Sequence, residues 1–235
     1  MTDPGRRAEL AASLEQVRER IERACVAAGR PPGAVTLTAV TKTYPASDVL
    51  LLAGLGVTDV GENRDQEAAA KAAEVSAAGV RLRWHFVGRL QRNKAGSVIR
   101  YADVIESVDS VRLAAALAKA AAERETPLEV LVQVSLDGDP ARGGVTGDDL
   151  WRVSDAVASS EALRLGGVMA VAPLGEDPGA AFARLAVIAG RMASDHPGAT
   201  TVSAGMSGDL EAAVRHGATH VRIGTSLLGM RNSLR

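Results

Sequence analysis

A single lysine, Lys42, follows an apolar run at residues 35–41 and precedes Pro45 by three positions. The run is rich in β-branched residues, which is typical of a buried strand, and Pro45 ends it. Because strand side chains alternate between two faces, we expect Lys42 on the same face as Val40. A lysine at the carboxyl end of a buried strand is expected to lose hydration, which favours the neutral amine that forms a Schiff base with a carbonyl. The alternative is a lysine whose ammonium group simply reaches solvent.

Two glycine-containing turns near the end of the chain have the composition of anion sites. Residues 207–209 precede a helical run and place Ser207 at or near its N-cap, while residues 224–226 open a short C-terminal helix. Free N–H groups and the positive end of a helix dipole attract an anion, most often phosphate. Helix capping explains either turn alone. Two such turns on neighbouring strands, with Arg222 two residues before one of them, favour a phosphate site.

The position of Arg222 between Val221 and Ile223 predicts that its side chain points into the fold if theirs point outward. A buried guanidinium group without an acceptor is costly. The acceptor is either a carboxylate of the chain, Glu62 or Asp209, or a ring nitrogen or phosphate group of a ligand.

The segments that must position these residues alternate between strands and helices. Apolar side chains three or four positions apart predict an N-terminal helix at about residues 5–29. Short apolar runs predict eight strands, at residues 35–41, 59–61, 84–88, 103–106, 128–135, 165–171, 200–204 and 220–224. Helices are predicted between them, at residues 46–55, 63–77, 89–100, 110–123, 147–160, 178–194 and 208–216.

Eight strands joined by helices predict a parallel sheet. A closed (β/α)8 TIM barrel, formed by residues 1–235 as a single domain with an additional N-terminal helix, accounts for this count. An open doubly wound sheet is the alternative, although residues 41–45 lack the glycine-rich fingerprint that usually follows its first strand. In a barrel the active site lies at the carboxyl ends of the strands, which brings Lys42 and both glycine turns to one face.

The composition limits the cellular compartment and the binding partners that we expect. The chain has 27 Lys and Arg against 28 Asp and Glu, which argues against a general binder of nucleic acid or membrane surfaces. The N-terminus is polar, and no apolar run approaches the length of a membrane span. The single cysteine, Cys25, has no partner for a disulfide, so we expect a cytoplasmic protein. No His, Cys and Asp residues have metal-ligand spacing, so no metal is expected.

The motifs around these residues resemble those of the YggS/PROSC family of pyridoxal phosphate homeostasis proteins, whose fold is similar to the barrel domain of bacterial alanine racemase. The likeness runs from about residue 10 to residue 230 and rests on residues 39–45, 61–63, 84–91, 205–209 and 221–225. The resemblance implies which residues hold pyridoxal 5′-phosphate: Lys42 through the Schiff base, Ser207 and the backbone of Gly224 and Thr225 on the phosphate, Asn63 beside the ring, and Arg222 at the pyridine nitrogen. An arginine there weakens the cofactor as an electron sink.

Some positions depart from the family pattern, namely Arg64-Asp65, Arg89, Arg142 and Ala204. Arg142 stands where a lysine is usual, so no second Schiff-base lysine is available at that position.

Several other residues near the strand ends have two interpretations. His85 either lines the cofactor pocket or is a barrel histidine satisfied by its neighbours. Met169 and Met206 either contact the cofactor ring or pack the barrel. We expect Glu106 to form a salt bridge, and the basic residues 89–94 to form a solvated helix start.

These features predict storage, buffering or delivery of pyridoxal 5′-phosphate by a monomer, with PLP-dependent apo-enzymes as partners. The alternative is an amino-acid racemase or related enzyme that uses Lys42. A racemase of the related fold needs a second acid/base, supplied by a tyrosine of a second domain, and we expect none because the sequence ends at Arg235. The only tyrosines are Tyr44, which is very close to Lys42 in sequence, and Tyr101. A third hypothesis, a phosphate-sugar enzyme with a catalytic lysine, predicts a colourless protein.

Overall fold

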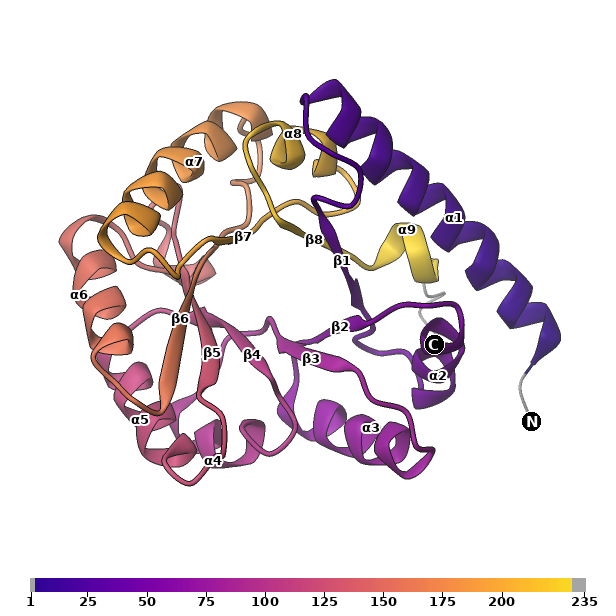
Figure 1. Cartoon of the computed structure of the whole chain (residues 1–235), viewed down its shortest axis with the longest axis horizontal. Coiled ribbons are helices and arrows are strands. Elements are labelled where there is room, and N and C mark those ends of the chain that lie inside the picture. Colours follow the sequence, from indigo (N-terminus) through magenta and orange to yellow (C-terminus); the bar gives the residue numbers. More distant parts are fainter. Residues whose placement is uncertain (1–2, 230–235) are drawn as a thin grey trace.

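Eight parallel strands close into a barrel in sequence order, and the pairing of β1 with β8 completes the ring (Figure 1). The structure is a computed structural model, and it describes residues 3–229. The strands are β1 (Thr36–Val40), β2 (Asp59–Glu62), β3 (Arg83–Phe86), β4 (Val104–Val108), β5 (Leu128–Gln133), β6 (Leu163–Met169), β7 (Thr201–Ser203) and β8 (His220–Ile223). The predicted (β/α)8 barrel is confirmed, and the open doubly wound alternative is wrong because β1 and β8 are paired.

Helices surround the barrel (Figure 1). They are α1 (Pro4–Ala27), α2 (Ala46–Gly54), α3 (Asp65–Ala77), α4 (Ala95–Val98), α5 (Val111–Ala121), α6 (Gly147–Ala158), α7 (Pro178–Asp195), α8 (Leu210–Arg215) and α9 (Thr225–Leu228), with 3-10 turns η1 (Arg92–Lys94) and η2 (Pro140–Arg142). The helix predicted at residues 89–100 is much shorter than expected. The backbone at Gln91 is extended, so helical structure begins only at Arg92 and consists of η1 and α4.

The N-terminal helix α1 lies outside the seam between β1 and β8. The Asp3 carboxylate caps it by accepting hydrogen bonds from two backbone amides of its first turn. The apolar residues Leu10, Leu14, Val17 and Ile21 are buried, and the helix packs against α8, α9 and α2. The predicted helix at residues 5–29 is therefore confirmed, and its apolar stripe covers β1, which Lys42 follows, and β8, which carries Arg222.

The two faces of the strands differ in character. Val221 and Ile223 join the apolar layer between the strands and the helices, while Arg222 points into the barrel, as their alternation predicts. A small apolar cluster of Val104, Leu131 and Met169 lies apart from that layer. The side chains of Ser203 and Glu106 lie next to Arg222 inside the barrel.

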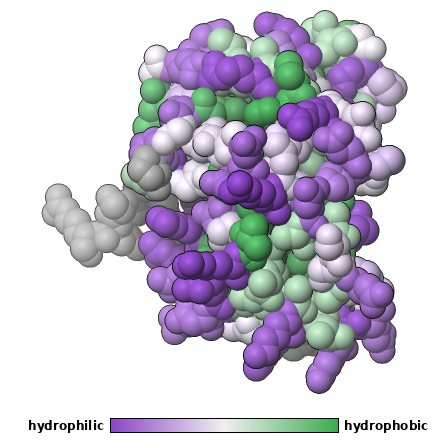
Figure 2. Space-filling model, turned by 90° about the vertical axis from the view of Figure 1, so that its left-hand side faces the viewer, coloured by the Kyte–Doolittle hydropathy of each residue, from purple (hydrophilic) through white to green (hydrophobic). Residues whose placement is uncertain are grey.

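The outer surface is predominantly hydrophilic on the face shown in Figure 2, with small hydrophobic patches between the polar side chains. Within residues 3–229, no helix combines the length and the apolar character that crossing a membrane requires.

Candidate functional site

Lys42 occupies a tight turn directly after β1. The Tyr44 amide donates a hydrogen bond to the Thr41 carbonyl over 3.1 Å, which makes Lys42 and Thr43 the central residues of the turn. The Lys42 side chain is exposed and makes no hydrogen bond or ion pair with any described residue. The prediction that strand burial removes its hydration is wrong, because β1 ends at Val40 and the turn carries the side chain into solvent.

The other lysines of the chain are Lys71, Lys94 and Lys119. Lys71 is 5% exposed and fully engaged in hydrogen bonds, and Lys94 lies 3.8 Å from the Asp65 carboxylate. Lys119 is in α5, far along the helix from the strand ends. Lys42 is therefore the lysine that is exposed, unpaired and directly after a strand.

Lys71, on α3, contacts the turn that contains Lys42. Its ammonium nitrogen lies 2.8 Å from the Thr41 carbonyl oxygen, 2.5 Å from Glu62 Oε1 and 3.2 Å from Glu67 Oε1. The Thr41 hydroxyl also donates to Glu62 Oε1, over 2.6 Å. Burial raises the pKa of Glu62, although these hydrogen bonds oppose the shift. We did not identify Lys71 from the sequence, where its only signal is the spacing of four residues from Glu67.

Asn63 follows β2 and offers an unused acceptor. Its Oδ1 atom is buried and accepts no hydrogen bond from the described residues. A Cβ at Gly88 would lie 2.3 Å from the Asn63 carbonyl oxygen, so glycine at this position allows the segment after β3 to pack there. Buried polar atoms are nearly always paired, so a ligand that donates a hydrogen bond fits beside Asn63.

The two glycine turns are joined by a hydrogen bond from the Ser226 amide to the Ser207 hydroxyl oxygen, over 3.2 Å. Gly205, before the first turn, has φ +91°. A Cβ there would lie 2.6 Å from the Ala213 Cβ, so the close approach of α8 also requires glycine. Asp209 closes the same turn by accepting from the Met206 amide over 2.6 Å.

Four backbone amides in these turns are free. The N–H groups of Ser207, Gly208, Gly224 and Thr225 donate no hydrogen bond within the described part of the chain. The Ser207 hydroxyl accepts from Ser226 and retains its own proton to donate. These donors fit a phosphate group, whose oxygens are strong acceptors.

Arg222 is on β8, two residues before Gly224. Its side chain lies inside the barrel, and the residue is 5% exposed. Its guanidinium donates to Ser203 Oγ over 2.7 Å and to the Ala170 carbonyl over 2.9 Å, and lies 3.8 Å from Glu106 Oε2. Burial lowers the pKa of Arg222, but guanidinium remains charged in proteins. Two strands, β6 and β7, therefore help to fix its orientation.

The expected acceptors of Arg222 on the chain, Glu62 and Asp209, are both wrong. The Glu62 side chain points out of the barrel to Lys71, because Glu62 alternates with inward-facing neighbours on β2. Asp209 is occupied by the Met206 amide.

His85 and Glu106 extend this polar network inside the barrel. The His85 ring nitrogens lie 2.7 Å from Glu106 Oε1 and 2.9 Å from Asp59 Oδ1, and Ser203 donates to Glu106 Oε2 over 2.6 Å. Burial alone lowers the pKa of His85, but its hydrogen bonds to the two carboxylates raise it to about 9. Burial likewise opposes ionisation of Glu106, yet His85 and Arg222 hold the pKa of Glu106 at about 2. An imidazolium between two carboxylates thus anchors the network that supports Arg222.

The structure also tests the expectations for Glu106, His85, Met169 and Met206. The salt bridges predicted for Glu106 are present. Both ring nitrogens of His85 are occupied, which favours the barrel histidine satisfied by its neighbours. Met169 is 2% exposed and packs with Val104 and Leu131, whereas Met206 is 39% exposed in the turn after β7.

Four adjacent strands bring the predicted cofactor residues together. β7 pairs with β8, β8 with β1, and β1 with β2. The side chains and amides at the ends of these strands belong to Lys42, Asn63, Ser207, Gly224 and Thr225. Within residues 3–229, no group of three His, Cys, Asp or Glu residues is arranged to hold a metal ion.

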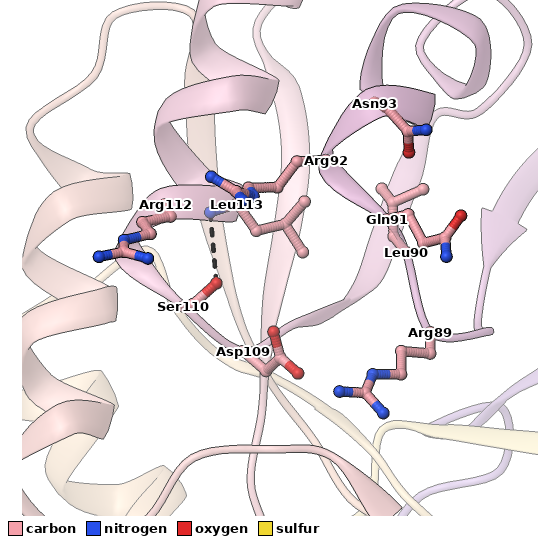
Figure 3. A pocket seen from close by; sticks show the side chains of 9 residues that line it. All are labelled: Arg89, Leu90, Gln91, Arg92, Asn93, Asp109, Ser110, Arg112 and Leu113. Atoms are coloured by element: carbon pink, nitrogen blue, oxygen red, sulfur yellow. Dashed lines mark hydrogen bonds between the residues drawn. The ribbon is translucent and has the colours of Figure 1, made fainter.

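A separate pocket of about 930 Å³ opens at the ends of β3 and β4 (Figure 3). Its lining consists of Arg89, Leu90, Gln91, Arg92, Asn93, Asp109, Ser110, Arg112 and Leu113. The Arg89 side chain points toward Asp109 in this view. Arg89 and Arg92 are exposed and Lys94 is half-buried, so these basic side chains are solvated as predicted. The predicted helix start at residues 89–94 is only partly present, because the 3-10 turn η1 begins at Arg92.

Comparison with known proteins first gives the class of the fold. The family described as "Alanine racemase, N-terminal domain" matches residues 12–232. The crystal structure of alanine racemase from Corynebacterium glutamicum superposes with a TM-score of 0.67 at 15% identity, over 97% of this chain and 64% of that one. The fold is thus the (β/α)8 barrel of the alanine racemase N-terminal domain.

Relatives with higher identity define the family. The pyridoxal phosphate homeostasis protein of Mycobacterium tuberculosis is 47% identical over 97% of this chain and 95% of its own length, and that of Escherichia coli K12 is 36% identical over 95% and 97%. The structure of PipY from Synechococcus elongatus with PLP bound has a TM-score of 0.81 and 34% identity, over 94% of this chain and all of that one. The chain belongs to the family of pyridoxal phosphate homeostasis proteins.

Proposed function

We propose that this protein binds pyridoxal 5′-phosphate at the ends of β7, β8, β1 and β2, as a Schiff base on Lys42, and serves the homeostasis of that cofactor by storing, buffering or delivering it. The observation that carries the proposal is the combination of an exposed, unpaired lysine with free amides in the turns that follow two neighbouring strands. The names of its relatives and the PLP-bound structure of PipY support the same function.

Each residue of the site has a distinct task. Ser207 and the amides of Gly224 and Thr225 bind the phosphate, which their free donors suit. Asn63 supplies an unpaired acceptor beside the ring. The cofactor, when bound, contributes an aldehyde that reacts with the Lys42 amine.

The position of Arg222 favours storage of the cofactor over catalysis with it. Its guanidinium is fixed by Ser203 and the Ala170 carbonyl, and it is the residue that we place at the ring nitrogen. A permanently charged donor at that position keeps the nitrogen unprotonated, which weakens the cofactor as an electron sink.

We also propose that the protein has no catalytic role of its own. A racemase needs an acid/base across from the lysine, and neither tyrosine of the chain suits that role. The Tyr44 hydroxyl donates to the Gly229 carbonyl over 2.6 Å, and the Tyr101 hydroxyl is buried, which raises the pKa of Tyr101. We place the protein in the cytoplasm as a monomer, with PLP-dependent apo-enzymes as recipients of the cofactor.

Absorbance titration of the purified protein with pyridoxal 5′-phosphate tests this function. Wild type should acquire the visible band of a protein-bound Schiff base, and Lys42→Ala should not. A colourless wild-type protein would contradict the proposal and favour the phosphate-sugar hypothesis. Rapid cofactor-dependent racemisation of alanine by wild type, lost in Lys42→Ala, would instead support the racemase alternative.

A further inference from the structure

The backbone at Thr43, next to Lys42, has a conformation that its residue type disfavours. Its φ is +69°, and it is the only residue other than glycine with a positive φ among residues 3–229. Thr43 is the third residue of a turn closed by the Tyr44 amide, a position at which positive φ normally selects glycine. A β-branched residue there is strained, and such strain persists only where surrounding contacts impose it.

The contacts that impose this conformation come from α3 and β2. Glu67 Oε1 accepts a hydrogen bond from the Thr43 amide. On the other side of Lys42, the Thr41 carbonyl accepts from Lys71 and the Thr41 hydroxyl donates to Glu62. The residues that flank Lys42 are therefore both fixed, while the Lys42 side chain is free.

Glu62, Glu67 and Lys71 form one ionic cluster behind the turn. Lys71 donates to both carboxylates, over 2.5 Å to Glu62 and 3.2 Å to Glu67. Lys71 is 5% exposed and Glu62 is fully buried. Buried ion clusters are a weak source of stability, because desolvation offsets the attraction between the charges. The more specific effect of this cluster is on the conformation of the turn that it contacts.

We propose that the Glu62–Glu67–Lys71 cluster positions Lys42 for its reaction with the cofactor by imposing the strained turn at Thr43. The inference rests on the proposed function of Lys42. The three residues are positioning residues, since Glu67 and Lys71 contact the backbone beside Lys42 and Glu62 accepts from the Thr41 hydroxyl. Without the acceptor at Glu67, the turn relaxes toward a negative φ at Thr43 and the lysine leaves its position.

A double-mutant cycle between Glu67 and Thr43 tests this inference. Glu67 is partly exposed and lies on a helix, so Glu67→Ala is compatible with folding. We expect Glu67→Ala to weaken binding of pyridoxal 5′-phosphate about tenfold, the size of one charge-assisted hydrogen bond. Glu67→Gln keeps an acceptor and should restore most of the affinity. In a Thr43→Gly background, Glu67→Ala should cost less than about threefold, because glycine adopts positive φ without strain.

Two controls separate positioning from general damage. Thr43→Ala removes the same side-chain atoms but keeps the Cβ, so Glu67→Ala should remain costly in that background. Affinity of the cofactor-free protein for inorganic phosphate should be unchanged in Glu67→Ala, because the phosphate donors lie on other turns. Equal losses in the wild-type and Thr43→Gly backgrounds, or a parallel loss of phosphate affinity, would overturn the inference. Failure of wild type to bind the cofactor at Lys42 would refute the proposed function instead.

Discussion

The Ser226 amide donates a hydrogen bond to the hydroxyl oxygen of Ser207, 3.2 Å away, and this contact joins the turns that follow β7 and β8. The two serines are nineteen residues apart in sequence, yet their turns follow paired strands. The hydroxyl proton of Ser207 remains available because the oxygen acts as acceptor toward Ser226. The proposed phosphate donors are thus brought together by the pairing of β7 with β8.

Replacement of Ser207 by alanine should weaken binding of pyridoxal 5′-phosphate. Loss of one hydrogen bond to a charged group costs about 1.5–3 kcal/mol, or roughly ten- to a hundredfold in affinity. Absorbance titration measures the effect, and pyridoxal, which lacks the phosphate, is the control ligand whose affinity should barely change. Equal affinity of Ser207→Ala and wild type for pyridoxal 5′-phosphate would show that this hydroxyl does not bind the phosphate.

Substitution of Gly205 by alanine should destabilise the protein and weaken cofactor binding. The new methyl group would lie 2.6 Å from the Ala213 Cβ, at a residue with φ +91°. Together the overpacking and the backbone strain should cost on the order of 2 kcal/mol of unfolding free energy. Gly208→Ala, in the same loop, is the matched control, because a Cβ at that residue would have no neighbouring atom within 4 Å. Urea denaturation distinguishes the two variants, and similar stabilities would contradict the packing described at Gly205.

The stability of the barrel should depend on the charge of His85 at alkaline pH. The folded-state pKa of about 9 is above the ordinary value of 6.5, so the stabilisation is complete below about pH 6.5 and is lost as pH rises through 9. The shift corresponds to on the order of 3 kcal/mol. The free energy of unfolding of wild type, relative to His85→Gln, should therefore fall between pH 7 and pH 10. A difference between the two proteins that stays constant over this range would show that His85 is neutral in the folded state.

The protein with its cofactor should be a poor catalyst of proton exchange at the α-carbon of alanine. Arg222 is held by Ser203 and the Ala170 carbonyl. The Tyr44 hydroxyl is paired with the Gly229 carbonyl, and the Tyr101 hydroxyl is buried with a raised pKa, so neither suits a second base. Proton exchange with deuterated solvent, followed by NMR, should proceed little faster than with free pyridoxal 5′-phosphate. Fast exchange that is abolished in Lys42→Ala would establish an enzyme.

The sequence predicts the barrel well because strand alternation and helix periodicity are local signals. The inward direction of Arg222, for example, follows from the outward direction of Val221 and Ile223. Its acceptors do not follow, since Ser203, Ala170 and Glu106 come from strands whose register is set only when the barrel closes. Lys71 was missed for the same reason: its contact with Thr41 spans thirty residues. The exposure of Lys42 depends on where β1 ends, and strand ends are not fixed by local patterns.

Covalent trapping tests the central claim most directly. Purified protein would be incubated with pyridoxal 5′-phosphate, reduced with borohydride, digested and mapped by mass spectrometry. The chain contains only four lysines, so each can be followed. We predict that the reduced pyridoxyl group is on Lys42, while the buried Lys71 is unmodified. Modification of Lys71, Lys94 or Lys119 with Lys42 left intact would contradict the assignment of Lys42 as the cofactor lysine.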